Sequence, residues 1–164
     1  MAFAGYVKIE GIDGESTDDK HPKWIEILSY NHSISQAAGA STSRTGGMTG
    51  ARPDIGDFTF VKVLDLATPN LAKYCMSGKH IPTVEVELCA ADEAAHPYMK
   101  YKLSDVVVSS IRKGGASNDE GTRPVEEVGI RFAKIEYEYT PFDNKGKAGA
   151  AVKSGYDLAT NKAL

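Results

Sequence analysis

The sequence predicts a mainly β fold: a β-barrel of long, bent antiparallel strands with one flanking short α-helix, formed by a single domain over residues 1–164. Three observations predict it. Apolar residues recur with a period of two along much of the chain, as expected of strands with one buried face. Two of the longest stretches change phase midway, which indicates a bulge or a sharp twist. One short stretch has helical spacing and is too brief to be stable alone, so it must pack against a sheet.

The composition is that of an ordinary globular protein and excludes several partners. The chain is 41% hydrophobic and 25% charged, with a net charge of -3, which favours one domain with its own core. Because there is no basic stripe, we expect no binding to nucleic acid. No apolar run approaches membrane-spanning length, so we expect no membrane insertion. Residues 1–6 lack the features of a signal peptide, so any export is expected to bypass the general secretory route.

The N-terminal part is expected to form two strands. The first covers residues 3–9, with Phe3, Val7 and Ile9 on one face. Residues 11–22 are polar and turn-rich, and are expected to form a solvated loop. The second strand covers residues 23–35, where a change of phase near Leu28 places Leu28, Tyr30 and Ile34 on one face. The other face then carries small polar side chains that either line a wet channel or face bulk water: Ser29, Asn31, Ser33 and Ser35.

Residues 36–53 form a long segment rich in Ala, Gly, Ser and Thr that cannot build its own core. A loop of this length inside a compact domain is either disordered or functional. Contact with another subunit is the functional interpretation that we favour. The candidate contact residues are Thr45, Gly46, Gly47, Met48 and Thr49. Deleting residues 46–50 is expected to leave the protomer folded but to weaken its assembly.

The central unit, residues 55–89, predicts strand, helix and strand. The helix begins at Thr68-Pro69 and ends at Gly78, because proline suits the first turn and glycine the left-handed residue that closes a helix. In the following strand Val84, Val86 and Leu88 alternate with polar residues. If this strand forms a hairpin with the next one, Glu85 and Glu87 would lie opposite Lys100 and Lys102.

After a connection over residues 90–97, two further long strands are expected, over residues 99–111 and 125–139, and the second again changes phase after Phe132. A linker then covers residues 143–151. A short final strand is expected over residues 152–158.

Signals for catalysis are scarce. No phosphate loop, dinucleotide fingerprint or zinc-protease helix is present. The two cysteines lack metal-ligand spacing, so we expect no metal and no cofactor. Cys75 is expected on the apolar face of the helix and Cys89 on the outward side of its strand, as free thiols. An enzyme that uses His32 with Asp57 and a small-molecule or lipid carrier with an apolar cavity remain the alternatives to a non-enzymatic structural protein.

Several motifs together resemble the Hcp family (haemolysin-coregulated protein), the inner-tube subunit of bacterial type VI secretion systems. They are Gly14-Glu15-Ser16, Phe60-Val61-Lys62 with Asp65, Thr68-Pro69-Asn70-Leu71, Ser77-Gly78-Lys79-His80-Ile81-Pro82, Val106-Val107-Val108-Ser109-Ser110 and Gly155-Tyr156-Asp157. The resemblance covers essentially the whole chain.

This resemblance implies homohexameric rings that stack into a hollow tube inside a contractile sheath, tipped by the VgrG spike. It also implies small effectors carried in the lumen, and expulsion from the bacterial cytoplasm to the outside or into a target cell. Ser29, Asn31, Ser33 and Ser35 would then line the lumen. Residues 36–53 would correspond to the extended loop that reaches neighbouring subunits or rings.

Overall fold

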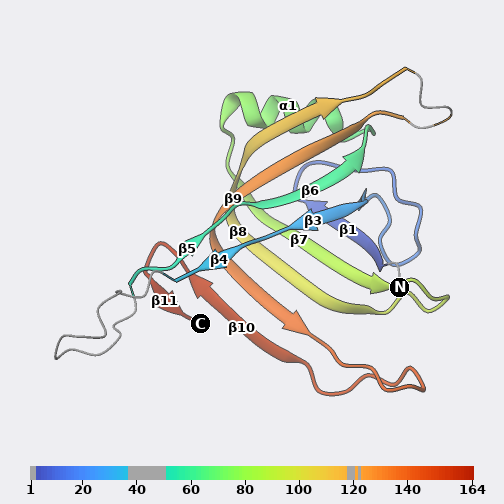
Figure 1. Cartoon of the computed structure of the whole chain (residues 1–164), viewed down its shortest axis with the longest axis vertical. Helices are drawn as coiled ribbons and strands as arrows, with labels where there is room; N and C mark the ends of the chain where they lie inside the picture. The colour runs from blue at the N-terminus through green and yellow to red at the C-terminus, as the bar shows by residue number, and fades with distance from the viewer. Residues whose placement is uncertain (1–2, 37–50, 118–120, 122) are drawn as a thin grey trace.

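The computed structural model describes residues 3–36, 51–117, 121 and 123–164. It is built almost entirely of strands, with one helix at one side (Figure 1). The elements in chain order are β1 (Phe3–Ile9), β2 (Ile25–Ile27), β3 (Ser29–Asn31), β4 (Ile34–Ser35), β5 (Asp54–Ile55), β6 (Phe58–Val63), α1 (Thr68–Ser77), β7 (Ile81–Ala90), β8 (Pro97–Gly114), β9 (Val125–Tyr139), β10 (Val152–Asp157) and β11 (Lys162–Ala163). The expected β class is confirmed.

All strand pairings of the main sheet are antiparallel, and β9 pairs with three other strands. Its whole length pairs with β8, while its first part also pairs with β6 and its last part with β10. The partner changes between Ile130 and Lys134. The buried residues of β9 change parity in the same region, from Phe132 to Ile135. The predicted change of phase is therefore confirmed, and its cause is a strand that serves two different neighbours.

The barrel closes at Leu28. β1 pairs with β7 and β2, whereas β3 pairs with β6, so two ladders meet in the single stretch of chain from Ile25 to Asn31. Between them, the amide of Leu28 donates a hydrogen bond to the carbonyl of Val61 at 2.7 Å. The ring of pairings is thus completed by the continuity of the chain and not by one unbroken strand.

The expected continuous strand over residues 23–35 is wrong, because this region is divided into β2, β3 and β4. The change of phase does fall where it was predicted. Its consequence differs, however, since Leu28 is 59% exposed and Ile34 is 56% exposed. Only Tyr30 of that predicted face turns inward, where it packs against the core.

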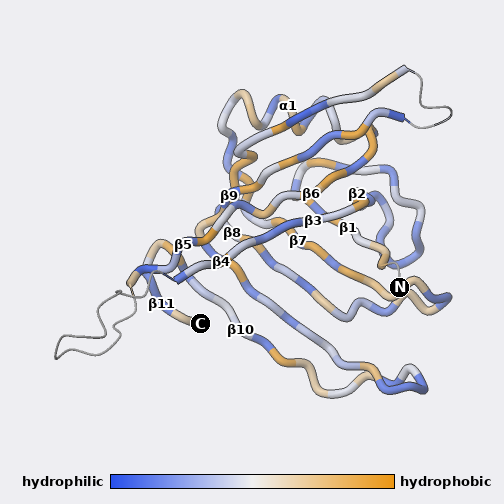
Figure 2. The backbone as a smooth tube through the Cα atoms, viewed as in Figure 1, coloured by the Kyte–Doolittle hydropathy of each residue, from blue (hydrophilic) through white to orange (hydrophobic). Residues whose placement is uncertain are grey.

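The core lies inside the barrel, and apolar and polar residues alternate along the strands around it (Figure 2). Part of the barrel interior is filled with rings, including Tyr30, Phe58, Tyr101 and Tyr137. The ring centroids of Phe58 and Tyr101 are 5.3 Å apart, within the range of favourable aromatic contacts.

The segment between β1 and β2 is not the solvated loop that its polarity predicts. Ile12, Ser16 and His21 are buried. The segment folds back on itself through backbone hydrogen bonds, including the amide of Ser16 to the carbonyl of Trp24 at 3.0 Å. It satisfies its own backbone groups in this way and can pack as a unit against the outer side of the sheet.

Helix α1 has the predicted bounds and packs against β8. Gly78 ends it at φ 64°, and the amide of Gly78 donates to the carbonyl of Tyr74. Among the helix residues only Leu71 is fully buried. The described part of the chain contains no helix of the length and hydropathy needed to cross a membrane.

Candidate functional site

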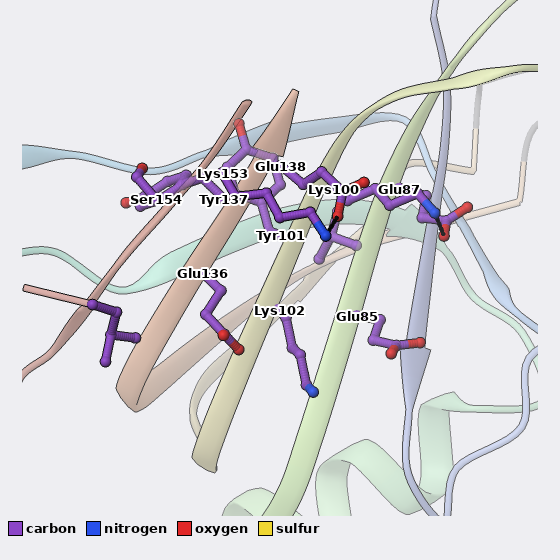
Figure 3. Close-up of a pocket in the computed structure, with 12 residues that line it drawn as sticks. Glu85, Glu87, Lys100, Tyr101, Lys102, Glu136, Tyr137, Glu138, Lys153 and Ser154 are labelled. Carbon is purple, nitrogen blue, oxygen red and sulfur yellow. Dashed lines mark ion pairs between the residues drawn. The ribbon is translucent and has the colours of Figure 1, made fainter. Parts of the chain in front are cut away.

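A groove of about 510 Å³ lies on the outward face of β7, β8, β9 and β10 (Figure 3). Charged side chains cover this face in two rows across the strands. One row runs through Glu87, Lys100, Glu138 and Lys153, and the other through Glu85, Lys102 and Glu136. The sign of the charge alternates from strand to strand in both rows.

The register confirms the predicted pairing of Glu85 with Lys102 and of Glu87 with Lys100. Lys100 Nζ lies 3.3 Å from Glu87 Oε1, and Lys153 Nζ lies 3.5 Å from Glu138 Oε2. Because these groups are partly exposed, each pair contributes only a few tenths of a kcal/mol and mainly fixes the register. The result is a hydrated surface of mixed charge, which suits weak contacts better than catalysis.

The four predicted lumen residues, Ser29, Asn31, Ser33 and Ser35, are all exposed. None of them is packed in the protomer core, which would have ruled out a lumen role. Ser33 packs closely against Gly56, because a Cβ added at Gly56 would lie 2.5 Å from Ser33 Oγ. Their assignment to a lumen stays a prediction, and the charged face is a second candidate for that wall.

Strands β4 and β5 form a separate two-stranded arm that extends away from the barrel (Figure 1). Ile34 pairs with Ile55 in this arm. A groove of about 270 Å³ runs between the arm and β10, and its lining includes Ile34, Ile55 and Tyr156. The predicted contact residues Thr45, Gly46, Gly47, Met48 and Thr49 lie outside the described residues.

The structure does not bring His32 and Asp57 together as an acid–base pair. His32 Nε2 lies 2.9 Å from the hydroxyl of Tyr137, and burial lowers the pKa of His32 below its ordinary value of 6.5. The carboxylate of Asp57 instead accepts a hydrogen bond from Ser109 Oγ at 2.6 Å and one from Arg131 Nε at 3.1 Å. These contacts stabilise the fold around each residue and give no support to the alternative of an enzyme.

The carrier alternative requires an apolar cavity inside the barrel. The aromatic side chains around Phe58 fill this region: the Phe58 ring lies 5.7 Å from that of Tyr30 and 5.8 Å from that of His32. The groove of about 510 Å³ lies on the charged outer face instead. Nothing in this packing favours a bound lipid.

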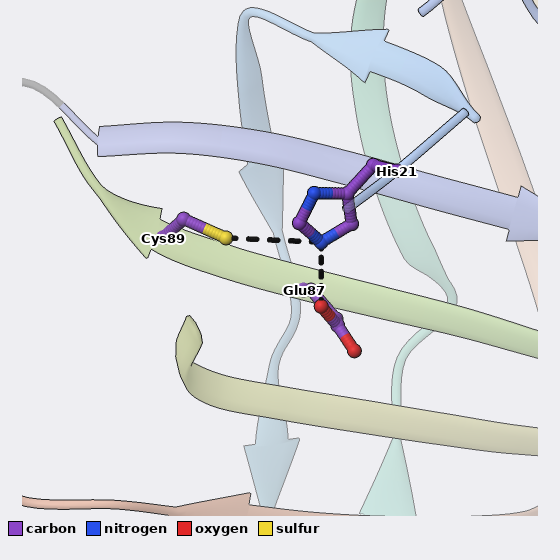
Figure 4. Close-up of side chains that lie close together, drawn as sticks. All are labelled: His21, Glu87 and Cys89. Atoms are coloured by element: carbon purple, nitrogen blue, oxygen red, sulfur yellow. Dashed lines mark hydrogen bonds and ion pairs between the residues drawn. The ribbon is translucent and has the colours of Figure 1, made fainter. Parts of the chain in front are cut away.

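Sequence reasoning missed a cluster formed by Asp18, His21, Glu87 and Cys89. Figure 4 shows the last three of these side chains. Cys89 was expected to face outward but is fully buried, because the segment before β2 covers that part of the sheet. Burial raises the pKa of the Cys89 thiol to about 11, so this thiol is not an activated nucleophile. Cys75 is half-buried, and both cysteines are free, as expected. The only signal in the sequence is the polar residue pattern around His21, which also fits a solvated loop.

Comparison with known proteins shows which family this chain resembles in sequence and in fold. The family model described as "Type VI secretion system effector, Hcp" matches residues 6–139. Protein hcp1 of Pseudomonas aeruginosa is 33% identical over 163 residues, which cover 98% of each chain.

Two solved structures extend the likeness to the whole fold. One, described as a type six secretion system protein, is 34% identical with a TM-score of 0.94, covering 99% of this chain and 100% of the other. Hcp1 from Salmonella typhimurium is 35% identical with a TM-score of 0.80, and both chains are covered completely. The protein is thus a β-barrel of the type VI secretion system. The chain belongs to the Hcp family.

Proposed function

We propose that this chain is the structural subunit of a type VI secretion tube. Homohexameric rings stack into a hollow tube inside a contractile sheath, and contraction expels the tube from the bacterial cytoplasm. In this proposal the VgrG spike caps the tube, and small effectors travel in its lumen. The observation that carries it is the likeness to Hcp structures over the full length of the chain.

Features of the protomer support assembly with further copies. The arm of β4 and β5 leaves Ile34 more than half exposed, and β10 and the C-terminal residue expose Val152 and Leu164. Exposed apolar side chains on a projecting arm favour contact with another protein surface. The short edge strand β11 also leaves backbone groups unpaired at one end of the sheet, where another chain can add hydrogen bonds.

The native mass tests the proposal. Size-exclusion chromatography with light scattering should give six chains per particle, and electron microscopy should show rings. The variant Ile34→Asp should shift the mass toward the monomer while circular dichroism stays unchanged, because the side chain contributes little to the core of the protomer. The matched variant Ile34→Val should assemble like the original chain. A monomer at high protein concentration would contradict the proposal.

The arm variant also separates assembly from folding. Loss of assembly together with loss of the β signal would mean that Ile34 acts in the protomer and not between protomers. An unchanged mass for Ile34→Asp would show that the arm is not part of the interface between protomers, but it would not contradict the ring.

A further inference from the structure

Three donor atoms of different chemistry meet where the segment before β2 covers β7. They are His21 Nε2, Glu87 Oε2 and Cys89 Sγ, and all lie within 4.8 Å of one another (Figure 4). His21 Nε2 is 2.6 Å from Glu87 Oε2 and 3.9 Å from Cys89 Sγ. His21 and Cys89 are buried, while the carboxylate of Glu87 reaches toward the partly exposed groove of the charged face.

We propose that His21, Glu87 and Cys89 form a binding site for a divalent transition metal, with zinc as the best match. Imidazole nitrogen, carboxylate oxygen and thiolate sulfur are the three kinds of ligand that zinc takes in proteins. Three protein ligands leave a fourth position for water. Softer thiolate coordination disfavours calcium and magnesium, which require oxygen ligands.

The distances fit a tetrahedral ion after a small adjustment. Zinc bonds of about 2.0 Å to nitrogen and about 2.3 Å to sulfur place these two atoms about 3.5 Å apart. The observed separation of 3.9 Å is therefore close to what an ion requires. Glu87 must move its Oε2 away from hydrogen-bonding distance to His21, and its side chain has 17% of its surface exposed on the side of the groove.

The neighbours of His21 fix the orientation of its imidazole ring, as is usual for a histidine that binds a metal. Asp18 Oδ2 lies 2.7 Å from His21 Nδ1, on the side opposite the proposed ion. A carboxylate on the second ring nitrogen fixes the tautomer and the orientation of a metal-bound histidine. The ring of Tyr6 stacks on the imidazole at 4.2 Å, and the edge of Trp24 packs against it at 4.9 Å.

The charges around the cluster are compatible with a cation. Asp18 and Glu87 are acidic, whereas Lys100 lies 3.3 Å from the other oxygen of Glu87, and Lys20 binds the carbonyl of Ala94 nearby. Metal binding displaces the proton of the Cys89 thiol and any proton on His21 Nε2 to solvent, with no change of oxidation state. The ion then joins the segment before β2 to β7.

Spacing in the sequence predicted no metal, because the donors are 66 and 68 residues apart along the chain. Only the fold brings them together. The proposal is independent of tube formation, since all three ligands come from one protomer.

The test uses the full chain without an affinity tag. Equilibrium dialysis against micromolar Zn²⁺ followed by metal analysis should give one ion per chain. With Co²⁺ as the probe, a thiolate-to-cobalt charge-transfer band should appear in the near ultraviolet. Cys89→Ser should lose this band, while the matched variant Cys75→Ser should keep it. Asp18→Asn should weaken the affinity for Zn²⁺ by about 10–100-fold.

Circular dichroism checks that each variant is folded. If Cys89→Ser does not fold, cadmium NMR of the unchanged chain decides the question, because sulfur ligation shifts the cadmium signal strongly. A chain that binds no Zn²⁺, or a cobalt band that survives in Cys89→Ser or disappears in Cys75→Ser, would overturn the proposal. A cadmium signal without sulfur ligation would do the same.

Discussion

Lys62 and Glu126 form an ion pair of 2.6 Å between two fully buried side chains on neighbouring strands. Lys62 Nζ also binds Asp65 Oδ1 at 2.7 Å, and Thr68 Oγ1 donates to Glu126 Oε1 at 2.8 Å. The pair therefore joins β6 and β9 to the first turn of α1. A buried charge with several hydrogen bonds is costly to leave without its partner.

Lys62→Met should destabilise the protomer by about 3–5 kcal/mol, because the buried carboxylate of Glu126 would lose the ammonium group 2.6 Å away and keep only Lys113 Nζ at 3.9 Å. Urea denaturation followed by circular dichroism measures this change. The control Lys153→Met removes a lysine that is 71% exposed beside Glu138, and should cost less than about 1 kcal/mol. The double variant Lys62→Met with Glu126→Leu should recover much of the loss. Equal effects of the two single lysine variants would contradict this account.

Gly14→Ala should destabilise the fold by about 1–3 kcal/mol. A Cβ at this position would lie 2.5 Å from the carbonyl oxygen of Trp24 and 2.8 Å from the Cα of Ile25, and backbone atoms cannot move aside easily. Gly114→Ala is the matched control, because a Cβ added there would meet no atom within 4 Å. Thermal unfolding of both variants gives the comparison. A similar unfolding temperature for the two would show that the segment before β2 packs less tightly than described.

His32 should make stability depend on pH. Because burial lowers its pKa, the unfolded chain binds a proton below about pH 6.5 while the folded chain does not until a lower pH. Stability is therefore lost as the pH falls from about 6.5 to the pKa of the folded state. His32→Gln should reduce this dependence of the free energy of unfolding on pH. NMR titration of the ring measures the pKa directly, and a value at or above 6.5 would refute the argument.

The lumen assignment of Ser29, Asn31, Ser33 and Ser35 makes a prediction about distances across the ring. Spin labels at Asn31→Cys, in a chain that also carries Cys75→Ser, should lie closer to their copies in other protomers than labels at Lys102→Cys on the charged face. Pulsed dipolar spectroscopy on the assembled ring measures both sets. The opposite order would assign the lumen wall to the charged face of β7 to β10.

The β class, the bounds of the helix and the hairpin register could be predicted because each depends on local pattern. Helix α1 follows from Pro69 and Gly78, and the pairing of Glu85 with Lys102 follows from alternation in two adjacent strands. Lys62 and Glu126 also left a signal, since each shares the parity of buried neighbours such as Phe60 and Val128. The signal was a charged residue at a position where the alternation along the strand predicts a buried side chain.

The rest depends on what covers each surface, and periodicity does not contain that information. Cys89 has the parity of an outward residue and is buried because a segment from far along the chain packs over it. His21 contacts Glu87 in the same cluster, and the two residues are 66 positions apart in the sequence. Leu28 is exposed at the point where two ladders meet, and its amide donates to the carbonyl of Val61. Each of these outcomes is decided by tertiary packing and not by local preference.

The crossing of the chain at Leu28 has a consequence for the order of folding. Residues 25–31 can be held on both sides only after β1 has docked on β7 and β6 on β9, and these contacts span large distances in the sequence. Such non-local steps are slow compared with the formation of the hairpin of β7 and β8. We expect this short crossing to be the last part of the barrel to acquire protection from hydrogen exchange during refolding, and the first to lose it.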